Sequence, residues 1–199
     1  MKKNLLTAVL MTLATTILLG LIYPLVVTAL AQVLFPHQAN GSLIRRNGAL
    51  VGSSLIGQGF SSPGYFHSRP SAAGNGYDAA NSGGTNLGPT SAKLIDRVKG
   101  DTELLLKENP GRQVPVELVT TSASGLDPDI SPAAAEYQVP RIARTRQMSE
   151  DAVRQLVSQH TSNRQLGLLG EPRVNVLELN LALDAARPRT TQQASATQP

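Results

Sequence analysis

An uninterrupted apolar stretch near the N-terminus limits what this chain can fold into. Residues Leu5–Phe35 read LLTAVLMTLATTILLGLIYPLVVTALAQVLF, 31 residues without Asp, Glu, Lys, Arg or His. A bilayer core of about 30 Å needs about 20 apolar residues at a rise of about 1.5 Å each. The stretch therefore predicts one transmembrane helix, and the more polar sequence after it predicts one attached soluble domain.

The same stretch could instead be a cleaved signal peptide, because Ala29-Leu30-Ala31 resembles a cleavage site. However, the apolar region before that site has about 25 residues, whereas a signal-peptide core has about 7–15. We therefore favour an uncleaved anchor. Pro24 lies inside this anchor and lacks a backbone donor, so we expect a kink there.

The charges flanking the span give a prediction of its orientation. Lys2 and Lys3 precede it and Arg45 and Arg46 follow it, so the side-chain count is tied. The α-amine adds charge to the N-terminal side, and long C-terminal domains are exported largely regardless of their charge. We predict a helix in residues 1–35 with a short cytoplasmic N-terminus, a periplasmic domain in 36–187 and a disordered tail in 188–199.

Composition excludes several classes of function. The chain carries a net charge of +4, but residues 36–187 hold 15 Lys and Arg against 14 Asp and Glu. A nearly neutral domain lacks the basic surface of a nucleic-acid-binding protein. The absence of cysteine excludes disulfides, thiolate metal sites and cysteine nucleophiles.

Turn and cap signals predict a small mixed α/β domain. Asn47-Gly48 is the favoured pair of a type I′ turn and predicts a hairpin. Thr90 or Ser91, Ser131 and Ser149 are N-cap candidates that predict three helices, the second of them kinked or broken at Pro140. The remaining expected elements are the hairpin strands Ser42–Arg46 and Ala49–Ser53, the second continuing to Gly57, and strands at Val114–Thr121 and Arg173–Asp184.

A loop of nearly thirty residues, Ser61–Pro89, separates the hairpin from the first of these helices. Loops this long are uncommon in compact domains. Four of the seven aromatic residues lie in or beside it, which argues against disorder. The loop is either a docking face for a partner or a segment that its own aromatics pin to the core, and both interpretations stay open. The partner-binding candidates are Phe60, Tyr65, Phe66 and Tyr77.

No catalytic motif is found. A P-loop is absent, and the glycine-bearing stretch 52–59 offers amides without a Lys. The sequence contains no G-x-S-x-G nucleophile motif, and His67 and His160 stand alone. Both observations disfavour a hydrolase triad. Asp127 and Asp129 flank a proline and are better explained as turn formers than as cation ligands. We therefore predict no catalytic residue and no metal site.

A cluster of arginines, Arg141, Arg144 and Arg146, lies on the helix expected after Ser131. Such a run is usually a solvated face. The alternative is contact with an acidic partner surface, for which Arg141 and Arg144 are the candidates.

Five long stretches remain to be considered together. They are FPHQANGSLI (35–44), VGSSLIGQGF (51–60), YFHSRPSAAGNGYDAANSGGTNLGPTS (65–91), VTTSASGLDPDISPAAAEYQVPRIARTR (119–146) and GEPRVNVLELNLALD (170–184). In this order they resemble the C subunit of the bacterial Kdp high-affinity potassium-transporting ATPase. The resemblance covers Leu5 to Asp184.

This resemblance implies an accessory membrane subunit without enzymatic activity, in the bacterial inner membrane. The implied partners are a channel-like potassium-translocating subunit, a P-type ATPase subunit and a small membrane subunit. The family's C subunit is associated with assembly of the complex and with raising the ATP affinity of the ATPase subunit, as a catalytic chaperone. ATP is thus implied through the partner, with no intrinsic cofactor.

The resemblance also implies a glutamine-containing element that helps to hold nucleotide, for which Gly57, Gln58 and Gly59 are weak candidates. A periplasmic domain could not touch cytoplasmic ATP, so we favour coupling through the membrane helix. Direct nucleotide contact is the first alternative. A single-span solute-binding or sensor protein is another, disfavoured because we expect only residues 1–4 on the inside.

Overall fold

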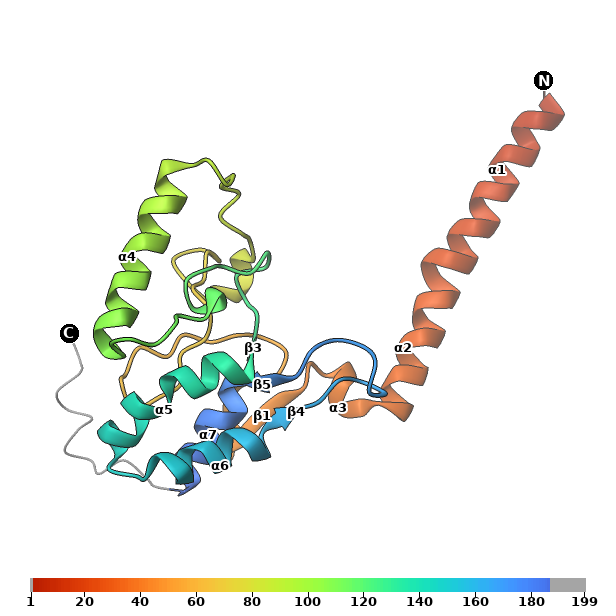
Figure 1. Cartoon of the computed structure of the whole chain (residues 1–199). Coiled ribbons are helices and arrows are strands. Elements are labelled where there is room, and N and C mark those ends of the chain that lie inside the picture. Colours follow the sequence, from red (N-terminus) through yellow and green to blue (C-terminus); the bar gives the residue numbers. More distant parts are fainter. Residues whose placement is uncertain (1, 187–199) are drawn as a thin grey trace. The chain divides into compact units, whose positions relative to one another are not determined.

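The computed structural model describes residues 2–186, and it confirms a mixed α/β protein with one long N-terminal apolar helix (Figure 1). The chain divides into two compact units, Met1–Ser53 and Ser54–Pro199. The hairpin therefore groups with the apolar helix. The expected boundary after residue 35 stays a prediction, and the expected disordered tail 188–199 lies outside the described residues.

The first unit begins with helix α1 (Lys2–Ile17), which runs through the π-helical segment η1 (Leu18–Ile22) into α2 (Tyr23–Leu34). This continuous helix is long and apolar enough to cross a membrane. The π-helical turn lies directly before Pro24, where an α-helix would bring the proline ring against the carbonyl of Gly20. The structure thus has a wider helical turn before Pro24, and the kink expected at this proline stays a prediction.

A short helix, α3 (Pro36–Ala39), precedes the hairpin of β1 (Leu43–Arg46) and β2 (Ala49–Ser53). Asn47 and Gly48 both have positive φ, 51° and 80°, so the predicted type I′ turn is confirmed. The predicted continuation of the second strand to Gly57 is wrong. Its residues leave the ladder because the Gly57 amide donates to the carbonyl of Leu126 instead, at 2.8 Å.

The second unit holds a three-stranded antiparallel sheet with β5 (Arg173–Asn175) between β3 (Asp129–Ile130) and β4 (Thr161–Ser162). Helices α5 (Pro132–Arg146), α6 (Glu150–Gln159) and α7 (Val176–Ala186) gather around it (Figure 1). Their apolar side chains, including Ile142, Val153, Leu179 and Leu183, form one buried core with Phe66.

Three of the predicted helix starts are confirmed. Ser91 is the N-cap residue of α4 (Ala92–Glu108), and Asn109 is its C-cap residue. The hydroxyls of Ser131 and Ser149 accept hydrogen bonds from the amides of Ala134 and Ala152 at the starts of α5 and α6. Pro140 does not break α5, which continues to Arg146.

The two other predicted strands need correction. Val114–Thr121 contains no strand; Pro115 offers no backbone donor, and the chain turns into a short 3₁₀ helix, η3 (Val116–Leu118). Arg173–Asp184 is a strand only to Asn175 and then becomes α7. The change from strand to helix falls between Asn175 and Val176.

Candidate functional site

The long loop Ser61–Pro89 is irregular as predicted, apart from the 3₁₀ turn η2 (Ala79–Asn81). Phe66 anchors it, because this side chain is fully buried in the core. Two consecutive residues of the loop, Phe66 and His67, are then held through their backbones by side chains from two different helices.

Asn180 of α7 holds Phe66. Its side-chain oxygen accepts from the Phe66 amide at 2.8 Å, and its side-chain nitrogen donates to the Phe66 carbonyl at 3.0 Å. Gln138 of α5 holds His67 in the same way, at 2.8 Å and 3.0 Å. Both amide side chains are buried, so each replaces the hydrogen bonds that a neighbouring strand would supply. We call Gln138 and Asn180 the amide clamp.

The sequence reasoning missed the amide clamp. The available signal was an amide residue inside an otherwise apolar helical segment, such as Asn180 within VLELNLAL. A buried amide in such a position requires internal partners.

Two arginines of α5 complete the attachment of the loop. Arg141 is 5% exposed, and its guanidinium donates to the carbonyls of Pro63 at 2.6 Å and Tyr65 at 3.0 Å. Burial lowers the pKa of Arg141, and the carboxylate of Glu108, 3.4 Å from its Nε, opposes this shift. Arg146 donates to the carbonyl of Gly64 at 2.7 Å.

The predicted solvated arginine face is therefore only partly correct. Arg144 is exposed, whereas the guanidinium groups of Arg141 and Arg146 are buried against the loop. The guanidinium of Arg141 already donates to loop carbonyls of its own domain. Partner contact through Arg141 or Arg144 stays a prediction.

The remaining aromatic candidates also hold the loop to its own domain. The Tyr65 hydroxyl donates to Asp184 at 2.9 Å, and its ring lies 4.7 Å from the guanidinium of Arg146 and 5.4 Å from the ring of Phe60. The Tyr77 hydroxyl donates to the carbonyl of Arg69, and burial raises the pKa of Tyr77. These contacts agree with the interpretation of a loop pinned by its own aromatics, and partner binding by Phe60, Tyr65, Phe66 and Tyr77 stays a prediction.

The expected cofactor candidates lie at the edge of the second unit. Gly57 is buried, and a Cβ atom there would stand 2.5 Å from the carbonyl oxygen of Asp127. A Cβ at Gly59 would stand 3.2 Å from the ring of Tyr77. Close packing accounts for both glycines, while Gln58 is half-buried between them. Nucleotide binding by these residues stays a prediction.

The aspartates considered as cation ligands serve the backbone and nearby arginines. Asp127 accepts from the amide of Asp129 at 3.1 Å and pairs with Arg69 at 3.2 Å. Asp129 pairs with Arg173 at 3.1 Å, and burial raises its pKa. Within residues 2–186, no group of three His, Cys, Asp or Glu side chains could hold a metal ion.

A cavity of about 290 Å³ lies between the clamped loop, α4 and α5. Burial, and next the charge of Arg141, lower the pKa of His67 in its wall, which favours the neutral imidazole. That ring is 3.0 Å from the carbonyl of Ser62. The cavity is lined by His67, Ser68, Pro70, Asp101, Leu104, Leu105, Glu108, Leu118, Gln138 and Arg141.

These features define a class of protein: a small α/β domain with an internally clamped loop, joined to one apolar helix of membrane-spanning length. The chain matches the family described as "KdpC: K+-transporting ATPase, c chain" over residues 5–185. It therefore belongs to the KdpC family of potassium-transporting ATPase subunits.

Curated relatives agree over nearly the whole chain. The potassium-transporting ATPase KdpC subunit of Koribacter versatilis is 64% identical over 191 residues, covering 96% of this chain and 99% of the relative. The KdpC subunit of Rhodopseudomonas palustris strain BisB18 is 58% identical, covering 94% and 100%. That of Acidobacterium capsulatum is 61% identical, covering 92% and 98%.

Proposed function

We propose that this chain is a non-catalytic accessory subunit of an ATP-driven potassium uptake pump. It assembles and stabilises a complex with a channel-like potassium-translocating subunit, a P-type ATPase subunit and a small membrane subunit. Membership of the KdpC family over residues 5–185 supports the complex.

The observation that carries this proposal is the amide clamp. A loop without regular secondary structure normally loses conformational entropy when it binds a partner. Here Gln138 and Asn180 hold two consecutive loop residues before binding. The exposed part of the loop is thus a pre-organised surface, which suits a permanent subunit contact.

The test places charges on the exposed part of the loop without touching its anchors. Asn75 and Ala79 are exposed loop residues. We expect the double variant N75E/A79R to keep its thermal unfolding midpoint and to lose co-purification with the large membrane subunits. The matched control is Ser158→Arg on the exposed side of α6. Equal recovery of the partners with both variants would reject the loop as the docking surface.

We propose further that the N-terminus is cytoplasmic and that the soluble domain lies on the periplasmic side. The α-amine supports this orientation, because it breaks the tie between Lys2 and Lys3 on one side of the span and Arg45 and Arg46 on the other. A cysteine introduced at the exposed Ser158 would be unique, because the chain has none. We expect a membrane-impermeant maleimide to label it once the outer membrane is permeabilised and the inner membrane is intact. Labelling only after the inner membrane is broken would reverse the orientation.

In this orientation, any effect on ATP affinity in the ATPase subunit is a coupling free energy transmitted through membrane helices. The backbone amide of Gly57 already donates a hydrogen bond to the carbonyl of Leu126. This amide is therefore not available to a nucleotide, which favours coupling through the membrane helices over direct nucleotide contact at Gly57–Gly59.

A further inference from the structure

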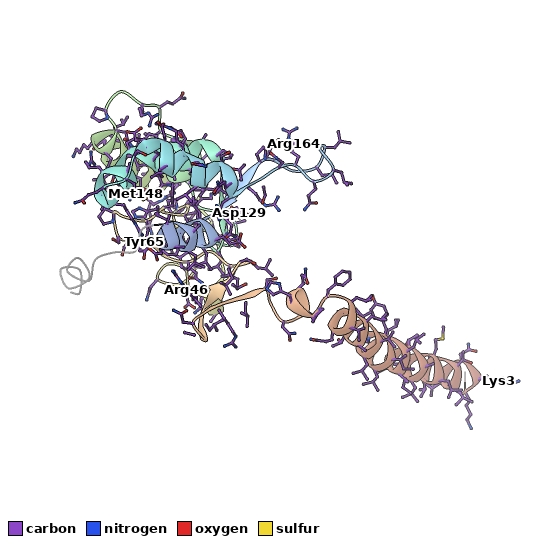
Figure 2. The ribbon with its side chains drawn as sticks, turned by 90° about the horizontal axis from the view of Figure 1, so that it is seen from below. Lys3, Arg46, Tyr65, Asp129, Met148 and Arg164 are labelled. Atoms are coloured by element: carbon purple, nitrogen blue, oxygen red, sulfur yellow. The ribbon has the colours of Figure 1, made fainter. Side chains whose placement is uncertain are left out.

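The segment between β4 and β5 carries three leucines at its tip that the rest of the second unit leaves uncovered. Leu166 is 91% exposed, Leu168 82% and Leu169 60%. Figure 2 shows the part of this segment that holds Arg164 extending away from the helices of the unit. We call residues 165–170 the leucine tip.

Backbone hydrogen bonds hold the leucine tip in one conformation. The Gln165 amide donates to the Leu169 carbonyl at 2.8 Å, and the Leu169 amide donates back at 2.9 Å. Leu166 and Gly167 both have positive φ, 53° and 74°. A positive φ is rare for leucine and raises the conformational energy of the backbone at Leu166. The leucine side chains of the tip nevertheless remain exposed.

Charge is confined to the base of the tip. Arg164 donates both to Oε1 and to Oε2 of Glu171, at 2.8 Å and 2.6 Å, and this pair closes the base. The six residues between them, QLGLLG, carry no charge. An uncharged aliphatic end above a charged base matches the boundary between lipid acyl chains and headgroups.

The composition of the tip favours lipid over a protein partner. Binding hot spots in protein interfaces are enriched in Trp, Tyr and Arg, and leucine is under-represented there. The tip offers only leucine, glycine and one glutamine.

The apolar helix, which is long enough to cross a membrane, would tether the second unit to a bilayer. This helix ends at Leu34 and the second unit starts at Ser54, so residues 35–53 span at most about 65 Å when fully extended. Such tethering gives the tip a high effective concentration at the membrane surface. A tether of this length acts in the same way at either leaflet, so contact of the tip with lipid does not depend on the proposed function.

We propose that Leu166, Leu168 and Leu169 insert into the acyl-chain region of the adjoining leaflet and give the soluble domain a second membrane contact. The first test uses the cysteine-free background, with Leu168→Cys carrying an environment-sensitive fluorophore. The full-length chain is reconstituted in vesicles of phosphatidylcholine and phosphatidylglycerol. Val116→Cys is the matched control, because Val116 is also apolar and 72% exposed.

We expect blue-shifted emission at position 168 and quenching by spin-labelled acyl chains, with neither at position 116. Equal behaviour of the two labels would overturn the proposal. A blue shift that needs the partner subunits and resists quenching by spin-labelled lipid would also overturn it, and would assign the tip to a protein interface.

A second variant, L166S/L168S/L169S, removes the apolar side chains that the domain itself leaves uncovered. We expect its unfolding midpoint to match the wild type, because no core contact is lost. In vesicles, trypsin should cut after Arg164 several-fold faster in the variant than in the wild type. In detergent the two rates should be equal; equal rates in vesicles as well would contradict insertion.

Discussion

At the scale of single residues, Gln138 and Asn180 decide how the long loop is held. Each supplies one donor and one acceptor to the backbone of a residue that lies 71 or 114 positions away in the sequence. An unsatisfied buried polar group costs about 1–3 kcal/mol, so the amide clamp is expensive to remove.

Gln138→Ala should therefore lower the free energy of unfolding by about 2–4 kcal/mol. The substitution leaves the amide and the carbonyl of His67 without their hydrogen-bond partner and creates a cavity beside them. The measurement is urea unfolding of the full-length protein in detergent, followed by tyrosine fluorescence. Gln147→Ala is the control, since Gln147 is exposed at the end of the same helix. A Gln138→Ala variant as stable as this control would show that the clamp contributes little.

The burial of His67 predicts how the stability of the folded protein depends on pH. Its folded pKa lies below the ordinary value because of burial and the nearby Arg141 charge. Below about pH 6.5 the unfolded chain therefore binds more protons than the folded chain, and stability falls as pH falls. Between pH 7.5 and 5.5, thermal unfolding midpoints should drop more for the wild type than for His67→Gln. Parallel curves would remove His67 as the cause.

At the scale of secondary-structure elements, Asn175 is the residue at which β5 ends and after which α7 begins. Its side-chain oxygen accepts from the amide of Glu178 at 3.1 Å at the start of α7, and its nitrogen donates to the carbonyl of Ser54 at 2.8 Å. Asparagine three residues before a glutamate is a helix-start signal. The apolar pattern of Arg173–Asp184 concealed this signal and led to the prediction of a strand.

Asn175→Ala should cost about 1–2 kcal/mol of unfolding free energy through the lost cap, and more if the bond to Ser54 is not replaced. Asn175→Ser keeps an acceptor for the cap without placing a second carboxylate beside Asp129, whose Oδ1 lies 3.3 Å from the Asn175 side-chain nitrogen, so it should recover part of the loss. Circular dichroism during urea unfolding measures both variants. If the alanine and serine variants are equally destabilised, the cap is not the origin of the effect.

At the scale of the whole molecule, one apolar helix joins the N-terminus to the domain. Its π-helical segment Leu18–Ile22 sits beside Pro24, so the helix has a local feature that a plain apolar span would lack. π-helical turns inside α-helices are frequent at functional sites. This makes the helix a candidate route for the proposed coupling to the ATPase subunit.

Replacing Leu5–Leu34 by an unrelated apolar span of equal length should retain membrane insertion but weaken the effect of this subunit on ATP affinity. The measurement is the ATP concentration dependence of hydrolysis by the reconstituted complex. Pro24→Ala is the more local variant and should shift the same dependence in the same direction. Membrane insertion with unaltered ATP affinity in both variants would reduce the helix to a tether.

The sequence by itself determined the features that depend on neighbouring residues. The apolar run specifies the N-terminal helix, Asn47-Gly48 specifies the hairpin turn, and Ser131 and Ser149 specify helix starts. Each of these signals acts within a few residues, so a single sequence suffices to read it.

Only the tertiary structure decided what holds the long loop. Residues 63–67 are hydrogen-bonded by Gln138, Arg141 and Asn180, which all lie more than 70 positions further along the sequence. A local sequence pattern cannot predict contacts between residues so far apart. Of the three arginines predicted on one solvated face, Arg141 and Arg146 are buried and donate to loop carbonyls. Burial of a backbone without a strand partner demands polar side chains, and the fold alone determines which side chains arrive there.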